Sequence, residues 1–234
     1  MTESIPFSIL YRDEHCIAIA KSPGIHVHHS ALSPHEQSCM PLLRDMLGTF
    51  VYPIHRIDRA TSGIVLFALN QESHSALNVC MREGSIKKRY HAIVRGWMES
   101  SICDSPIAID DKVREAETHF FMRAHKELEY PSSQFDTTRI SLMEVDLKTG
   151  RRHQIRKHCA HTRHPIAGDV RYGDGAFNRL FREHLGLHRL LLFATSLQFM
   201  HPITQEEVLI TYDPTRDDNS LQTFFERYQL IISQ

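Results

Sequence analysis

Six consecutive apolar residues, 64–69, indicate a buried β-strand. The nine residues before them, 55–63, read HRIDRATSG and place one carboxylate, Asp58, between two arginines. Gly63 closes this segment and gives the backbone conformational freedom at the entrance to the strand. Charged side chains are unusual against a hydrophobic core, so we interpret segment 55–63 as a functional site.

The composition is typical of a soluble globular protein: of 234 residues, 41% are hydrophobic and 24% are charged. There is no internal repeat, low-complexity segment or linker, so we predict a single domain over residues 1–234. No apolar run approaches the roughly 18 residues of a membrane span, and residues 1–8 lack the features of a signal peptide. We therefore expect a cytoplasmic protein.

The five cysteines are odd in number and widely spread, and no Cys-x-x-Cys occurs. This pattern favours neither a disulfide framework nor a thiolate zinc site. We expect reduced cysteines that serve as packing residues.

Basic residues are concentrated between Lys148 and Arg163, where no acidic residue occurs, although the net charge is −1. Such a block suits phosphate binding, because the local field at the contact surface attracts the anion. Helical spacing would place Arg152, Arg156 and Arg163 on one face, so a solvated helix face is the alternative interpretation. The basic residues of the block are Lys148, Arg151, Arg152, Arg156, Lys157 and Arg163.

The other predicted strands are short β-prone runs. Pro23-Gly24 marks a tight turn after the first two of them. The run 137–147 changes its apolar parity at Leu142, which predicts a β-bulge there. Residues 102–130 give mixed signals, and we assign no chemistry to them. Besides 64–69 and 137–147, the predicted strands are 8–10, 16–20, 87–97, 189–199 and 208–212.

Capping residues and the spacing of apolar side chains predict the helices. Ser38 is the expected N-cap of a helix that stops at Gly48, and Asn70 is the expected N-cap of a helix that ends near Gly84. The remaining predicted helices are 151–158, 179–184 and 221–228.

Three segments resemble motifs of the RluA family of pseudouridine synthases. Segment 55–63 matches the family pattern HRLDxxTSG with Ile57 as its one change, and segment 149–158, TGRRHQIRKH, matches TGRxHQ(I/L)RxH at every fixed position. Segment 87–97, KKRYHAIVRGW, places a tyrosine after basic residues at the head of a strand, as the family does. The resemblance covers residues 9 to about 211 and departs at 21–24, where KSPG rearranges the family's K-P-x-G.

The resemblance implies an α+β fold with a central mixed or antiparallel sheet, flanking helices and an RNA-binding cleft, and without a separate S4 RNA-binding module. It also implies the reaction, in which a uridine in RNA is isomerised to pseudouridine. The N-glycosidic bond must break, the uracil must turn, and the base must rejoin the sugar through carbon. A carboxylate can support this chemistry, as in glycosidases, so no cofactor and no metal are expected.

The resemblance assigns catalysis to Asp58, Tyr90 and Arg156. Asp58 is the expected nucleophile, and whether it attacks the ribose or the base stays open. Arg156 is expected to keep Asp58 ionised and oriented, and Tyr90 to stack on the uracil. From the residues alone, Asp58 could instead pair with Arg56 or Arg59. Arg156 could equally be a surface charge, and Tyr90 a core residue.

A duplex hides its bases, so the target uridine must be flipped out of the stack. Arg56 is suited to fill the gap that the uridine leaves, as its counterpart does in relatives. The other basic residues would grip phosphates without reading sequence. The expected RNA-binding residues are Arg56, Lys88, Arg89, Arg151, Arg152, Lys157 and Arg163.

Segments 88–97, 147–154 and 161–166 are most similar to the branch of the family that modifies tRNA. The resemblance therefore predicts uridine 65, in the T-arm stem of tRNA, as the target, and a uridine of ribosomal RNA is the alternative. Neither a membrane nor an obligate protein partner is expected.

Seventeen histidines raise the possibility of a metal site, because His158, His161 and His164 are spaced by three and His153 lies nearby. Such a site would indicate a metal hydrolase. Pro165 ends the helix before His164 can share its face, and no His-Glu-x-x-His occurs. A non-catalytic RNA-binding module would explain the basic block, but it leaves Asp58 among cations, where a carboxylate weakens phosphate binding.

Overall fold

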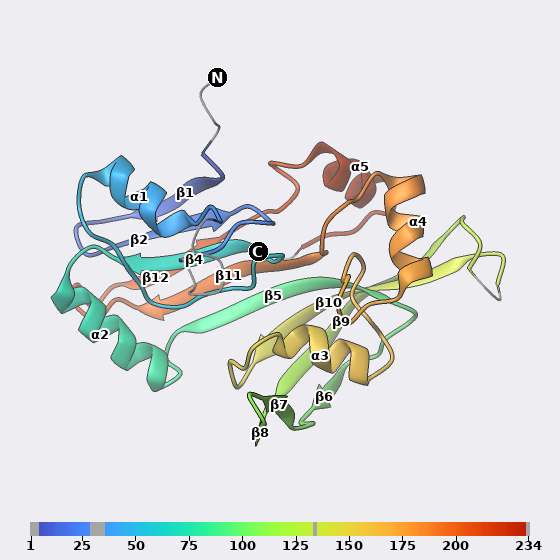
Figure 1. Ribbon diagram of the computed structural model, residues 1–234, viewed down its shortest axis with the longest axis horizontal. Helices are drawn as coiled ribbons and strands as arrows, with labels where there is room; N and C mark the ends of the chain where they lie inside the picture. Colours follow the sequence, from blue (N-terminus) through green and yellow to red (C-terminus); the bar gives the residue numbers. More distant parts are fainter. Residues whose placement is uncertain (1–4, 29–35, 133–134, 233–234) are drawn as a thin grey trace. The chain divides into compact units, whose positions relative to one another are not determined.

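The computed structural model describes residues 5–28, 36–132 and 135–232, which form two compact units (Figure 1). The first unit contains the described residues up to Lys88 together with Ala194–Tyr212. The second contains Arg89–Phe193 and the described residues from Asp213 onward. Each unit is built from separate stretches of chain, so the predicted single domain over 1–234 stays a prediction.

The strands of the first unit follow the order β1-β2-β4-β11, with β3 paired to β4 and β12 paired to β11. The β1–β2, β2–β4, β3–β4 and β11–β12 pairs are antiparallel. All seven residues of β4 are buried, as the apolar run 64–69 predicts. The bounds are β1 Phe7–Arg12, β2 Cys16–Lys21, β3 Tyr52–Pro53, β4 Ser62–Ala68, β11 Leu192–Met200 and β12 Glu207–Thr211.

The helices α1 (Cys39–Leu47) and α2 (Gln71–Arg82) of this unit begin and end where their caps predict. Ser38 occupies the N-cap position of α1, although its side chain makes no capping hydrogen bond, and Gly48 ends that helix in the left-handed conformation that glycine adopts easily. The Asn70 side chain accepts a hydrogen bond from the Ser73 amide at 2.8 Å, so it caps α2 as predicted.

In the second unit, β5 (Lys87–Arg95), β10 (Thr138–Leu147), β9 (Thr118–Leu128) and β6 (Ser101–Cys103) pair in that order, and β5 starts with two residues of the first unit. A separate hairpin joins β7 (Ile107–Ile109) to β8 (Lys112–Arg114). Its turn residues Asp110 and Asp111 both have positive φ angles, of 47° and 60°. Two positive φ angles are what a two-residue hairpin turn requires.

The predicted bulge occurs between Leu142 and Met143, but its extra residue, Arg123, belongs to the partner strand β9. Leu142 packs into a core beneath the helices α4 (Gly175–Leu185) and α5 (Asn219–Arg227). Its neighbour Met143 is also fully buried and points to the opposite face of the sheet, because adjacent strand residues alternate. Residues 140–145 of β10 are buried on both faces, and the change of apolar parity at Leu142 coincides with the bulge.

The helix α4 is longer than predicted, and α5 begins two residues earlier than predicted. They lie side by side through the Phe181–Phe224 ring contact (Figure 1). The predicted helix 151–158 is wrong at both ends, because α3 is Gln154–His161. The Gln154 side chain accepts hydrogen bonds from the Arg151 amide and the Thr149 hydroxyl, which holds residues 149–152 in a turn. With its sheets and these helices, the chain has the predicted α+β class.

Candidate active site

The loop that carries Asp58 connects β3 to β4 in the first unit. Asp58 is half-buried, and its carbonyl accepts a hydrogen bond from the Thr61 amide at 3.1 Å. At the end of the loop, Gly63 has a φ of +117°, and a Cβ atom there would lie 2.2 Å from the Ala194 carbonyl oxygen of β11. The positive φ uses the backbone freedom that the sequence predicts for Gly63, and the strand can pass this close to β11 only with glycine at that position.

Lys21 holds the Asp58 loop in place, and this role was not predicted from the sequence. Its side chain is completely buried, and Nζ donates to the carbonyls of Ser22, Ile25 and Arg59 at 2.8, 2.9 and 3.1 Å. The Gly24 amide also donates to the Arg59 carbonyl at 2.8 Å. The turn at Pro23-Gly24 therefore supports the Asp58 loop. Lys21, in segment 21–24, is the sequence feature from which this support could have been inferred.

The two arginines of the loop differ in their contacts. Arg56 is exposed, as a residue that enters RNA must be. Arg59 donates from Nε to the Gly24 carbonyl at 2.8 Å and lies 3.3 Å from Glu36. The Arg59 guanidinium thus has partners in the supporting turn, which accounts for one of the two arginines beside Asp58.

Arg156 and Tyr90 lie in the second unit, and both are buried. Arg156 Nε donates to Asp169 Oδ2 at 2.8 Å, and Nη2 donates to Oδ1 at 2.7 Å. The amides of Arg171 and Tyr172 donate to the same carboxylate. The Arg156 guanidinium and these two amides hold the pKa of Asp169 below its usual value, against the effect of burial. Arg156 is therefore a buried, oriented charge, and its interpretation as a surface charge is wrong.

The Tyr90 ring is buried on β5, opposite Val145 of β10. In the same unit, the Arg156 guanidinium lies 5.2 Å from the centre of the Tyr172 ring. The Tyr172 hydroxyl is 2.9 Å from His153 Nδ1. Asp58 belongs to the first unit, so its pairing with Arg156 stays a prediction.

The three predicted catalytic residues, Asp58, Tyr90 and Arg156, lie within one segment that matches a protein-family model. Residues 15–161 match the family model described as RNA pseudouridylate synthase. The chain belongs to this family. The predicted family and enzyme class are thereby confirmed: the protein is an isomerase of uridine in RNA.

Relatives and solved structures agree with the family. The chain is 41% identical to "tRNA pseudouridine synthase C" of Vibrio parahaemolyticus over 239 residues, which is 96% of each chain. It is 44% identical to the protein of that name from Vibrio cholerae, over 86% of this chain and 88% of the relative. Human RNA Pseudouridylate Synthase Domain Containing 1 shares its fold, with a TM-score of 0.71 and 22% identity over 100% of this chain and 99% of that one.

Most of the predicted RNA-binding residues are exposed. Arg151 donates from Nε to the Glu115 carbonyl at 3.0 Å, and half-buried Lys157 donates to the Ala108 carbonyl at 2.9 Å. Arg152 precedes α3 and Arg163 follows it with a φ of 66°, so the predicted single helix face with Arg156 is wrong. The exposed members of the set are Arg56, Arg89, Arg151, Arg152 and Arg163.

Two further residues of the predicted RNA-binding set also have partners inside the protein. Arg89 Nη1 lies 3.8 Å from the carboxylate of Glu144, which offsets part of its charge. Lys88 is half-buried, Nζ lies 3.7 Å from Met81 Sδ, and burial lowers its pKa. Lys88 is thus less suited to a phosphate contact than the exposed arginines are.

The histidines that suggested a metal site do not converge. His158 uses both ring nitrogens, one at 2.9 Å from the Thr118 hydroxyl and one at 2.9 Å from the Ser105 carbonyl. His164 Nδ1 lies 2.8 Å from the Arg95 carbonyl. These histidines therefore join elements of the second unit, which leaves the metal-hydrolase interpretation without support.

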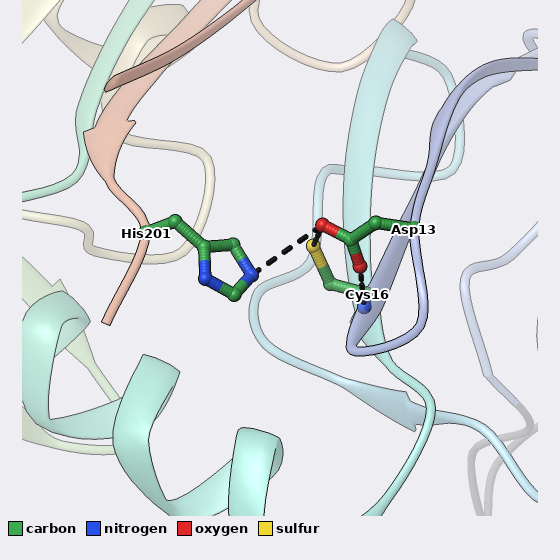
Figure 2. A group of neighbouring side chains, drawn as sticks. All are labelled: Asp13, Cys16 and His201. Carbon is green, nitrogen blue, oxygen red and sulfur yellow. Dashed lines mark hydrogen bonds and ion pairs between the residues drawn. The ribbon is translucent and has the colours of Figure 1, made fainter. Parts of the chain in front are cut away.

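A group with metal-ligand chemistry, Asp13, Cys16 and His201, lies in the first unit (Figure 2). His201 Nδ1 accepts from the amides of Ile203 and Thr204, so the ring proton sits on Nε2, which faces Asp13 at 3.4 Å. A protonated Nε2 cannot bind a metal ion. Asp13 already accepts from the amides of residues 15 and 16 and from the Tyr11 hydroxyl. The group holds the β1–β2 turn, and its donors do not suit a metal.

Among the described residues, no helix is long and apolar enough to cross a membrane.

All five cysteines carry free thiols. Burial raises the pKa of Cys39 to about 11, so its thiol stays protonated at neutral pH.

Proposed function

We propose that this protein isomerises one uridine of tRNA to pseudouridine in the cytoplasm, and that residues 1–234 act as a single catalytic domain. The observation that carries the proposal is Asp58 in a loop held by Lys21 and Gly63, within a segment that matches the family. Relatives that share 41–44% of their residues with this chain, over most of its length, are named tRNA pseudouridine synthase C. Their name supports tRNA as the substrate class.

Asp58 is the nucleophile in this proposal. The N1–C1′ bond of the uridine breaks, the uracil turns, and a C5–C1′ bond forms while the proton on C5 is lost and N1 gains one. Atoms balance without a cofactor, and the carboxylate can add either to the ribose or to the base. Arg156, held by Asp169, would keep Asp58 ionised and oriented. Tyr90 would stack on the flipped uracil.

The exposed arginines would supply affinity through phosphate contacts. The target we propose is uridine 65, in the T-arm stem. Flipping a paired base costs a few kcal/mol of lost pairing and stacking, which insertion of Arg56 and stacking on Tyr90 would offset. A uridine of ribosomal RNA is the alternative target.

Mapping of pseudouridines tests this proposal. Chemical labelling would be applied to tRNA and ribosomal RNA from cells with and without the protein, and to cells that carry the Asp58→Asn variant. We expect pseudouridine at tRNA position 65 to disappear without the protein or with the variant. An unchanged tRNA position together with a lost ribosomal site would reject the tRNA substrate and leave the family reaction in place.

A further inference from the structure

The pairing of β3 with β4 ends in an unusual way. Tyr52 pairs with Ala68, Pro53 pairs with Phe67, and the Ile54 amide then donates to the Leu66 carbonyl at 2.9 Å. In a hydrogen-bonded antiparallel pair, the two residues exchange both N–H···O bonds. The Leu66 amide would therefore be expected to donate to the Ile54 carbonyl.

The Leu66 amide donates instead to Nε2 of His55, at 3.2 Å. The imidazole thus takes the place of a backbone carbonyl at the last position of the ladder. Without such an acceptor, the Leu66 amide would be a buried donor with no partner, because Leu66 is fully buried. With it, the chain can leave the sheet at residue 55.

Acceptance at Nε2 also fixes the tautomer of His55. The Leu66 amide needs a lone pair on Nε2, so the single proton of the neutral ring sits on Nδ1, which is shielded from solvent. Burial lowers the pKa of His55 to about 3, the Lys88 ammonium lowers it too, and the Arg56 carbonyl acts in the opposite direction. The ring is therefore neutral and in one tautomer at physiological pH.

The position of His55 in the loop gives this bond its significance. Arg56 follows directly, and Asp58 follows three residues on, so the point where the chain leaves the sheet sets where both side chains start. The far end of the loop is held by the Thr61 amide on the Asp58 carbonyl and by the close passage of Gly63. His55 supplies the matching constraint at the near end.

We propose that His55 is a positioning residue for the reaction: its neutral imidazole ends the β3–β4 ladder by replacing a carbonyl, and so places Asp58 for attack. The inference rests on the proposed role of Asp58. A positioning error of about 1 Å at a reacting group can cost about a hundredfold in rate, and this sets the size of effect to be expected.

Two variants of His55 test whether its side chain acts as a hydrogen-bond acceptor or only fills space. In His55→Gln the side-chain carbonyl oxygen can reach the place of Nε2 and accept from the Leu66 amide, whereas His55→Phe keeps a ring but has no acceptor. His188→Phe is the control, because His188 is exposed and lies far along the chain. Each is measured for single-turnover pseudouridine formation at saturating enzyme, in excess over tRNA, for RNA dissociation constant and for melting temperature.

We expect His55→Phe to lose about a hundredfold in single-turnover rate, with its RNA dissociation constant unchanged. His55→Gln should recover most of that rate, and His188→Phe should match the wild type. A wild-type rate in folded His55→Phe would overturn the proposal. Equal rates in the Gln and Phe variants would also overturn it, because the acceptor would then be irrelevant.

A measurement that does not depend on enzyme activity tests this proposal separately from the proposed function. The ring nitrogens of His55 can be observed by ¹H–¹⁵N NMR in the wild-type protein, and we expect the proton on Nδ1 from pH 5 to pH 8. A proton on Nε2 would overturn the positioning role even if tRNA is modified. Wild-type protein that modifies no tRNA uridine would reject the tRNA substrate and leave the tautomer result standing.

Discussion

Arg156 and Asp169 form a two-pronged ion pair inside the second unit, with Nε and Nη2 of the arginine at 2.8 and 2.7 Å from the two carboxylate oxygens. Both side chains are almost fully buried. A guanidinium held along one edge has a fixed plane, and its remaining donors point in a defined direction. The proposed partner of Asp58 is thus oriented before RNA binds.

The first prediction concerns this geometry. A lysine is a point charge and cannot bridge both oxygens of Asp169, so Arg156→Lys should lower the single-turnover rate about a hundredfold with a much smaller effect on RNA affinity. Rates and dissociation constants measured on the same RNA across a salt series test this.

Lys157→Ala is the matched control for Arg156→Lys. Half-buried Lys157 contacts a carbonyl of the β7–β8 hairpin and is assigned to phosphate binding. Its loss should weaken binding and reduce the salt slope by about one, with little change in the single-turnover rate at saturating enzyme. If both substitutions alter rate and affinity alike, Arg156 is only another phosphate contact.

Gly63 provides a test of the loop support. An alanine there would place Cβ 2.2 Å from the Ala194 carbonyl oxygen, at a φ of +117° that residues with a side chain rarely adopt. We expect Gly63→Ala to lower the free energy of unfolding by about 3 kcal/mol or more, as measured in urea.

Gly150→Ala should change the same free energy by no more than about 0.5 kcal/mol. A Cβ at Gly150 meets no atom within 4 Å, and the backbone needs no positive φ. Similar losses for the two alanine variants would mean that the approach of Gly63 to β11 does not constrain the loop.

A third prediction concerns the dependence of stability on pH. His91 is buried, and burial lowers its pKa from 6.5 to about 4; Glu144 opposes the shift, while Arg123 and Arg89 add to it. Between those pH values the unfolded chain binds a proton that the folded protein does not. The contribution of His91 to the free energy of unfolding is therefore fully present above pH 6.5 and is lost as the pH falls towards 4. The contribution of His91 is about 3 kcal/mol.

Urea unfolding at a series of pH values checks this. His55, with its pKa near 3, contributes in the same direction, so the wild-type slope should be steep and His91→Gln should remove only part of it. His188→Gln, at an exposed site, should leave the slope unchanged. A slope that is identical in His91→Gln and in the wild type would show that folding does not lower the pKa of His91.

Local chemistry made several features predictable. Asn70 caps its helix because its side-chain oxygen reaches an amide three residues on, and this depends on sequence neighbours alone. The apolar run 64–69 had to be buried, and Gly63 has the backbone freedom that its φ of +117° requires. The parity change at Leu142 coincided with the bulge.

Features that depend on distant partners were not predictable. The helix α3 starts later than predicted because the Gln154 side chain accepts a hydrogen bond from the Arg151 amide and so holds that residue in a turn. The same side chain also donates to the Glu117 carbonyl, 37 residues away. The extra residue of the bulge lies in β9, within a region whose charged sequence hides its strands. Asp169 as the partner of Arg156, and Lys21 beneath Arg59, need the folded chain to bring them together.

The role of Asp58 is the central claim, and single-turnover pseudouridine formation by purified Asp58→Asn protein, with enzyme in excess over tRNA, tests it most directly. The substitution keeps the size of the side chain and removes the nucleophile, and melting temperature and RNA dissociation constant show that fold and binding are intact. We predict no pseudouridine under conditions in which the wild-type enzyme converts all of its substrate. Pseudouridine formed by folded Asp58→Asn protein at a rate near that of the wild type would contradict the account.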